Sequence, residues 1–205
     1  MKLIKIVANK FARFYIFVIR GTPMMVQSLI FYYAIFNLFK RTGMSVTEIN
    51  RVWSLFISGL VTVSLNSTAY LAEVLRGGIL AVDAGQMEAA RSLGMTHWQA
   101  MRRVVFPQAI KNSLPAIGNE FIINIKDSSV LCVLGVSDLM FMTRSVAGIY
   151  YKGTECYLIA ATVYLFLTYL SSLLLKAITG RMTAPDNTKR RQGNQTVDLG
   201  LPSSN

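Results

Sequence analysis

Long apolar stretches without a charged residue recur along the chain. Three of them, residues 21–39, 52–72 and 156–175, contain no Asp, Glu, Lys or Arg. A helix needs roughly 20 residues to cross the hydrocarbon core of a bilayer, which is about 30 Å thick. A soluble core helix of that length rarely lacks every charge. We therefore predict a membrane-spanning helix in each stretch.

A fourth apolar stretch, residues 114–134, carries charges inside it. Glu120, Lys126 and Asp127 interrupt an otherwise hydrophobic sequence. A charged side chain at the centre of a membrane helix costs about 2.5 to 3.5 kcal/mol on insertion scales, so it faces protein or water there. We expect a fourth span that is broken near Lys126 and Asp127 and that turns its charges toward the protein interior.

The two ends of the chain have different patterns. Residues 1–20 repeat apolar side chains on one helical face and place most of their Lys and Arg off that face, which predicts a basic amphipathic helix on the membrane surface. Residues 181–205 are polar and rich in Pro, Gly, Ser and Asn, which is typical of a disordered tail. The transmembrane domain is expected between them, at residues 21–180.

Composition and charge support this interpretation. Apolar residues make up 53% of the 205, charged residues only 15%, and the net charge is +11. A soluble domain has about 25% charged residues, so we expect an all-α integral membrane protein rather than a soluble or nucleic-acid-binding one. With four spans and both termini in the cytoplasm, 15 of the 21 Lys and Arg lie on the cytoplasmic side. This bias follows the positive-inside rule and places residues 76–111 in the cytoplasm.

The cytoplasmic segment, about residues 78–112, is predicted to contain two short amphipathic helices. Residues 84–93 are rich in helix formers, Gly94 is suited to a left-handed C-terminal cap, and Thr96 is suited to cap the next helix. Pro107 is expected to limit that second helix. A structured helical pair outside the membrane indicates a surface for a protein partner.

Two further helix ends are predicted from local signals. Thr22 and Pro23 are suited to be the N-cap and the first residue of a helix. Gly77 and Gly78 are suited to end one, with Arg76 at its negative pole. Glu73 lies three residues before Arg76, so an ion pair within the helix is expected.

Five short motifs follow one another along the chain. They are Arg20-Gly21-Thr22-Pro23, Ala72-Glu73-x-x-Arg76-Gly77-Gly78, Glu88-Ala89-Ala90 with Gly94 and Val104-x-Phe106-Pro107, Gly118-Asn119-Glu120-Phe121 and Lys126-Asp127-Ser128-Ser129. In this order they resemble motifs of the permease subunits of bacterial ABC importers for polar amino acids. The third is similar to the EAA loop of these permeases, with Val and Phe where the pattern has Ile and Leu. The similarity extends from about residue 10 to residue 180.

The resemblance implies a type I importer permease in the bacterial inner membrane. Two permease chains, identical or different, would pair, two ATP-binding subunits would dock beneath them, and an extracytoplasmic binding protein would deliver an amino acid. The permease itself would hydrolyse nothing and hold no cofactor or metal. Members usually have five spans, so the first is expected to be missing here. Coupling to the ATPases is expected through Glu88, Ala89, Ala90, Gly94, Met95 and Pro107.

Two other functions are less well supported. An intramembrane enzyme would need a catalytic pair or a metal motif in its spans, and His97, the only histidine, lies in the cytoplasmic segment. A secondary transporter that works without ATP would need no coupling segment, and no internal repeat of the spans is evident.

The charged interruption of the fourth span is the strongest candidate for a substrate site. A zwitterion needs one cationic and one anionic contact, which Lys126 could supply to the α-carboxylate and Asp127 to the α-ammonium. Ser128 and Ser129 would add neutral hydrogen bonds, and Glu120, Glu73 and Tyr70 are further candidates for the pathway. The alternative is a structural ion pair of Lys126 with Asp127 or Glu120.

Overall fold

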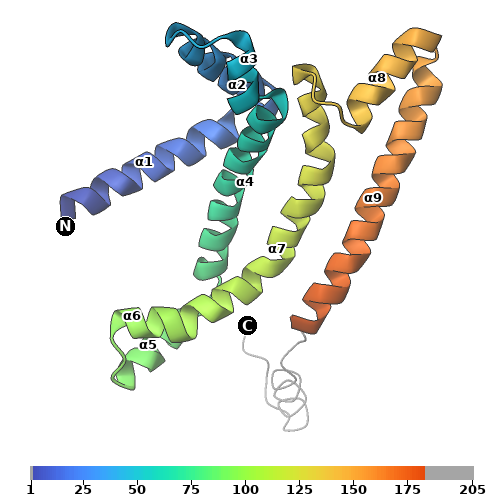
Figure 1. The fold of residues 1–205 in the computed structure, drawn as a ribbon. Helices are drawn as coiled ribbons and strands as arrows, with labels where there is room; N and C mark the ends of the chain where they lie inside the picture. The colour runs from blue at the N-terminus through green and yellow to red at the C-terminus, as the bar shows by residue number, and fades with distance from the viewer. Residues whose placement is uncertain (1, 183–205) are drawn as a thin grey trace.

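The computed structural model describes residues 2–182, with side chains described from residue 6 to residue 180. Every regular element in this part of the chain is helical, which confirms the all-α class (Figure 1). The predicted tail lies outside the described residues except for residues 181 and 182. The elements are α1 (Lys2–Gly21), α2 (Met24–Arg41), α3 (Val46–Val52), α4 (Leu55–Leu80), α5 (Ala84–Ser92), α6 (His97–Ala100), the π-helix η1 (Met101–Val105), α7 (Phe106–Asp127), the 3₁₀-helix η2 (Ser128–Leu134), α8 (Leu139–Tyr150) and α9 (Gly153–Met182).

The described helices supply up to four membrane spans by length and composition. Helix α4 and residues 153–180 of α9 qualify by themselves. Residues 6–21 of α1 qualify together with α2, from which they are bent by 113°, and residues 97–134 qualify together with α8 across a bend of 53°. The four predicted spans are reached only if each bent pair of helices counts as one span, and two spans are found otherwise.

Helix α7 packs between α4 and α9 (Figure 1). Gly78 of α4 is buried at the crossing, where an added Cβ would overlap the Ser113 hydroxyl and come within 2.7 Å of the Ala109 carbonyl oxygen. The Ser113 hydroxyl lies 2.9 Å from that carbonyl and 3.3 Å from the carbonyl of Val74 on α4. The prediction that Gly77 and Gly78 end the helix is therefore wrong. Helix α4 continues to Leu80, because Gly78 serves close packing rather than termination.

The junction of α1 and α2 corrects a second prediction. Pro23, not Thr22, occupies the N-cap position of α2, with φ −64° and ψ 136°, and no side chain caps the helix. The Thr22 hydroxyl instead donates to the carbonyl of Val18, 2.8 Å away. Thr22 thus completes the end of α1 rather than the start of α2, because the sharp bend leaves carbonyls of α1 without partners.

The start of α7 corrects a third prediction, because Pro107 does not limit the helix. The chain is helical without interruption from His97 to Leu134, and Pro107 lies in the first turn of α7. Proline lacks an N–H and its ring meets the carbonyl four residues earlier. The preceding residues widen to the π-helix η1, in which the Phe106 N–H donates to the Met101 carbonyl five residues back. This wider turn leaves space for the Pro107 ring beside the preceding backbone carbonyls.

The predicted break near Lys126 and Asp127 is a tightening of the helix rather than a gap. Helix α7 ends at Asp127, and the chain continues as the 3₁₀-helix η2 to Leu134. Gly135 then reverses the chain with a φ of 94°, a conformation that favours glycine. Leu131 of η2 is buried against Gly59 of α4, so this segment is packed between helices.

Helix α3, which was not predicted, connects α2 to α4 and has a capping box. The Glu48 N–H donates to the Ser45 hydroxyl, and Glu48 Oε2 accepts from the Ser45 N–H at 2.8 Å and from its hydroxyl at 2.7 Å. These hydrogen bonds lower the pKa of Glu48 below its ordinary value. Ile49 on the same helix is fully buried.

The crossing of α4 and α7 predicts opposite effects for two neighbouring glycines. Gly78→Ala should destabilise the protein by about 1 to 3 kcal/mol, because the methyl group overlaps the Ser113 hydroxyl. Gly77→Ala is the matched control, since nothing lies within 4 Å of its added Cβ and alanine is the better helix former. Thermal unfolding in detergent measures both. Equal midpoints for the two variants would contradict the packing argument.

Candidate functional site

A cavity of about 520 Å³ lies between the α1–α2 junction, α4 and α7. Its walls bring together residues from three of the five sequence motifs and four further residues. The motif residues are Arg20, Gly21, Thr22, Pro23, Glu120 and Asp127, and the others are Met24, Asn66, Tyr70 and Ile123. Three of the predicted pathway residues, Tyr70, Glu120 and Asp127, are among them. We call this cavity the central pocket.

Arg20 is the cation that lines the central pocket. It was not among the residues predicted for the substrate pathway. Its guanidinium carbon lies 5.1 Å from the centre of the Tyr70 ring, and one of its nitrogens lies 3.9 Å from Glu73 Oε2. A cation over an aromatic face is attracted by the ring's negative quadrupole. The sequence signal for a role of Arg20 was its position directly before Gly-Thr-Pro. Only the helix start at Thr22 and Pro23 was predicted from that segment.

Glu73 lies behind Arg20 and is not among the residues that line the pocket. Its Oε2 accepts hydrogen bonds from Arg76, at 3.1 Å from Nε and 2.7 Å from the terminal nitrogen. The predicted ion pair within α4 is thus confirmed. Because Glu73 serves both arginines, it links the end of α1 to α4.

Lys126, like Glu73, lies outside the lining of the central pocket. Lys126 is exposed and does not line the central pocket, whereas Asp127 does. Among the described residues, no ion pair joins Lys126 to Asp127 or Glu120. Ser128 and Ser129 lie on η2 beyond the pocket lining, and the Ser128 hydroxyl donates to the Ile125 carbonyl at 3.1 Å. The pocket therefore contains two carboxylates and one guanidinium.

Residues 83–100 form the predicted pair of capped helices. The Asp83 side chain caps α5 by accepting from the Gly85 N–H at 2.7 Å. Gly94 adopts a φ of +82°, as expected for a left-handed cap. Thr96 caps α6 in a capping box, in which its hydroxyl accepts from the Gln99 N–H and its own N–H donates to the Gln99 side chain at 2.9 Å.

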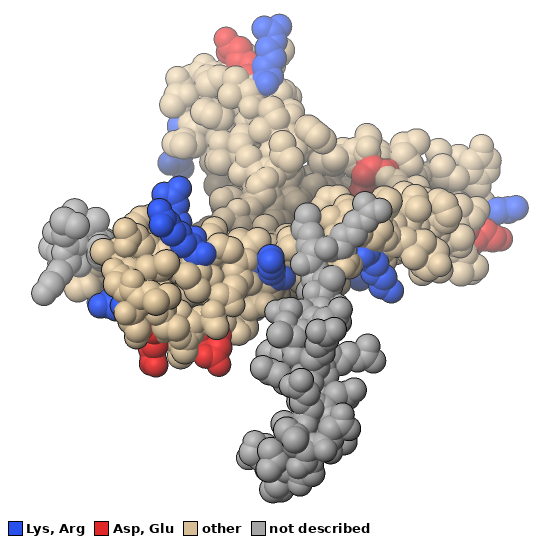
Figure 2. Space-filling view, turned by 90° about the horizontal axis from the view of Figure 1, so that it is seen from below, with Lys and Arg blue, Asp and Glu red and all other residues tan. Residues whose placement is uncertain are grey.

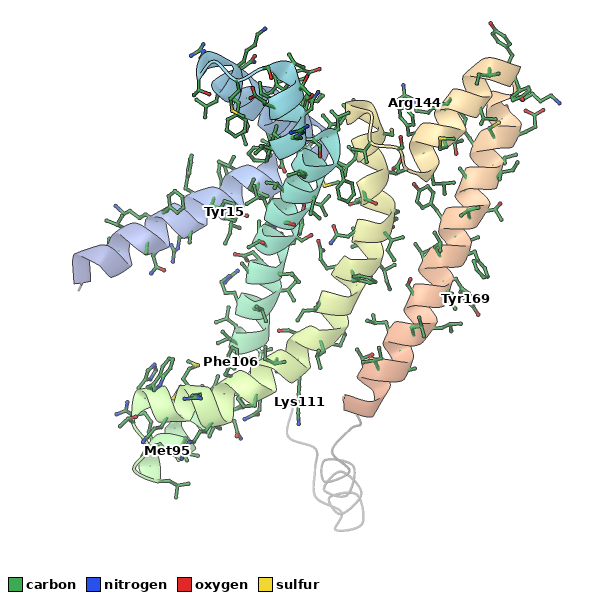
Figure 3. The ribbon with its side chains drawn as sticks, in the orientation of Figure 1. Tyr15, Met95, Phe106, Lys111, Arg144 and Tyr169 are labelled. Carbon is green, nitrogen blue, oxygen red and sulfur yellow. The ribbon has the colours of Figure 1, made fainter. Side chains whose placement is uncertain are left out.

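We call residues 83–100 the helical hairpin, and it protrudes at one end of the molecule (Figure 1). Met95 lies in the turn between its helices (Figure 3). Leu93 is 82% exposed and Trp98 is 71% exposed, whereas Ala90 and Ala100 are buried. The hairpin is thus held together by small alanines and turns two large apolar side chains outward. Large exposed apolar groups on a folded protrusion are typical of a docking surface.

The hairpin and its surroundings carry more basic than acidic residues. Figure 2, which views this end, shows Lys and Arg side chains over several parts of it. Lys111 of α7 points away from the helices (Figure 3). Five basic residues of residues 76–111 are exposed, against two exposed acidic ones: Arg76, Arg91, Arg102, Arg103 and Lys111 against Asp83 and Glu88. In the described part of the chain, no group of three or more His, Cys, Asp or Glu could hold a metal ion.

Bent membrane helices around a charged pocket, with a folded hairpin outside the apolar region, define a membrane transport subunit. Residues 3–184 match the family described as "Binding-protein-dependent transport system inner membrane component". The chain belongs to this family, as its motifs suggested. It is therefore a transport permease subunit and a multi-pass protein of the inner membrane.

Relatives of known name agree with this assignment. The chain is 34% identical to the glutamine transport system permease protein GlnP of Escherichia coli K12, over 86% of this chain and 76% of that protein. It is 37% identical to the probable amino-acid permease protein YxeN of Bacillus subtilis 168, over 89% and 78%. It is 34% identical to the nopaline transport system permease protein NocM of Agrobacterium fabrum, over 82% and 70%.

A solved structure supports the fold. It is described as the crystal structure of an amino acid ABC transporter with histidines. The two chains share 45% identity and superpose with a TM-score of 0.73, over 88% of this chain and 78% of the other. The family implies ATP-binding subunits and a substrate-binding protein as partners, and it favours neither a secondary transporter nor an intramembrane enzyme.

Proposed function

We propose that this chain is the permease subunit of an ATP-driven importer of a polar amino acid and that the central pocket binds the substrate during transport. The observation that carries the proposal is the meeting of Arg20, Glu120 and Asp127 in one cavity. Charged side chains at membrane depth are costly and mark substrate pathways. The relatives named above transport glutamine, nopaline or amino acids.

The pocket offers complementary charges to a zwitterion. Glu120 and Asp127 supply acceptors for the α-ammonium group, and Arg20 supplies a planar pair of donors for the α-carboxylate. Arg20 serves this role better than Lys126, because it lines the pocket and its side chain is positioned by the Tyr70 ring. Ser128 and Ser129 follow in the next turn, where they extend the pathway beyond Asp127.

The helical hairpin is the proposed coupling element. Leu93 and Trp98 would enter a cleft of the ATP-binding subunit, while Glu88, Ala89, Ala90, Gly94, Met95 and Pro107 maintain the shape and approach of the hairpin. ATP-driven closure of the ATP-binding subunits would then move the attached helices as rigid bodies. ATP is hydrolysed in that partner and not in this chain.

The proposed assembly contains two permease chains in the cytoplasmic membrane. Many apolar side chains of α9 are exposed in the single chain, and Glu120 and Lys126 have no ion-pair partner among the described residues. A second permease would cover the polar faces around a central pathway. The excess of basic residues near the hairpin supports a cytoplasmic side for the hairpin and for both termini, and α1 would lie against lipid.

Asp127→Asn tests the substrate site. Removal of one charged hydrogen-bond partner costs about 1.5 to 3 kcal/mol, so uptake into vesicles at saturating binding protein should fall about 10- to 100-fold. Assembly with the ATP-binding subunits should be unchanged. Glu155→Gln, an exposed carboxylate in the first turn of α9, is the control. Normal uptake per assembled complex would show that Asp127 has only a structural role.

Gly94→Leu tests the coupling element. A left-handed conformation costs an L-residue about 1 to 2 kcal/mol, so the turn should distort, and both uptake and substrate-stimulated ATP hydrolysis should fall at normal abundance in the membrane. Gly180→Leu is the control, because nothing lies within 4 Å of its added Cβ and its φ is not positive. Unchanged coupling in Gly94→Leu would refute the role of the hairpin.

The stoichiometry of the purified transporter tests the assembly. We expect native mass spectrometry to find two permease chains per complex, either two copies of this chain or one copy with a related chain. Dissociation of the pair should abolish uptake, since each chain alone would expose its polar face to lipid. A single permease chain that still transports in vesicles would contradict the proposal.

A further inference from the structure

Gln27 has an unusual environment for a polar side chain in an apolar helix. It lies in the first turn of α2 and is only 5% exposed. Its Nε2 donates to the Ile19 carbonyl at 2.7 Å, to the Thr22 carbonyl at 2.9 Å and to the Thr22 hydroxyl at 2.8 Å. Its Oε1 accepts from Asn66 Nδ2 on α4 at 3.2 Å. Both ends of the amide are therefore used.

The hydrogen bonds of Gln27 satisfy the backbone of the α1–α2 junction. A helix leaves its last four carbonyls without partners inside the helix, and the 113° bend prevents α2 from supplying them. Pro23 at the junction has no N–H to donate. An unpaired backbone group in an apolar surrounding costs several kcal/mol. Gln27 reaches back from α2 and pairs two of these carbonyls.

The same side chain connects two walls of the central pocket. One wall is the junction itself, from Arg20 to Met24, and the opposite wall includes Asn66 of α4. Gln27 does not line the pocket but binds both walls. A second contact lies beside it, where the Tyr15 hydroxyl donates to the Leu65 carbonyl at 2.6 Å (Figure 3).

We infer that Gln27 is a positioning residue that sets the spacing between the α1–α2 junction and α4 and thereby the affinity of the central pocket for its substrate. This inference rests on the proposed function of the pocket. Its chemistry is directional, because Nε2 faces three acceptors and Oε1 faces one donor. A carboxylate at this position would keep the bond to Asn66 and turn an acceptor toward the carbonyls of the junction.

Gln27→Glu should therefore disrupt the hydrogen bonds to the α1–α2 junction and keep the hydrogen bond to Asn66 of α4. We expect it to raise the KM for uptake about 10-fold or more with little change in the maximal rate, because transport still proceeds once the pocket is filled. Gln27→Met, which removes the hydrogen bonds without adding charge, should have the same effect and serves where the Glu variant does not assemble. The control is Asn124→Leu, which removes a 2.9 Å amide bond to Ser67 between α7 and α4 outside the pocket lining.

The spacing is measured independently of transport. Spin labels at the exposed positions Phe14 of α1 and Leu60 of α4, in a chain with Cys132 and Cys156 replaced by Ala, report the distance between α1 and α4 in the assembled transporter by pulsed electron paramagnetic resonance. Labelled chains are diluted with unlabelled ones, so that only distances within one chain are seen. Gln27→Glu and Gln27→Met should broaden or shift this distance, and Asn124→Leu should not.

The outcomes separate the inference from the proposal beneath it. An unchanged distance in both Gln27 variants overturns the inference, and so does a changed distance with an unchanged KM. If Asp127→Asn impairs uptake in either case, the pocket keeps its proposed function. If neither the Gln27 variants nor Asp127→Asn alters uptake, the pocket is not the substrate site and both statements are wrong.

Discussion

The pairing of backbone hydrogen-bond groups in apolar surroundings is the constraint on which this structure depends. A straight helix pairs these groups within itself, so each departure from a straight helix needs a local solution. At the α1–α2 junction, the side chains of Thr22 and Gln27 bind freed carbonyls. Before Pro107, the chain widens into a π-helix, and after Asp127 it narrows into a 3₁₀-helix that ends at Gly135.

These departures are also where the charged groups gather. Arg20 stands at the end of α1, and Asp127 stands at the last residue of α7, and both line the same cavity. A bend or change of helix type opens space beside a helix, and a charge placed there is kept away from lipid. The bend at the α1–α2 junction and the change of helix type after Asp127 therefore also provide the space in which Arg20 and Asp127 lie.

The sequence predicted those features that depend on local interactions. Uncharged length indicated the candidate spans, and the caps of the helical hairpin followed from Gly94 and Thr96, because each cap forms within a few residues. The prediction from sequence failed where one local pattern is compatible with two structural roles. Gly78 was interpreted as a helix end because close packing against Ser113 is a tertiary contact that no local pattern encodes. Likewise the role of Arg20 in the pocket was not predicted, because it depends on a 113° bend.

The uninterrupted helix from His97 to Asp127 has a mechanical consequence. It is supported near its middle, at Ser113, by the close crossing with Gly78 of α4. At 1.5 Å per residue, the hairpin lies about 24 Å to one side of this crossing and Asp127 lies about 21 Å to the other. Pro115 lies inside α7 only two residues from this crossing, and the helix curves between α6 and the upper part of α7 (Figure 1). A proline removes one backbone hydrogen bond of a helix, so a movement of the hairpin reaches Asp127 only as far as the helix resists bending at this point.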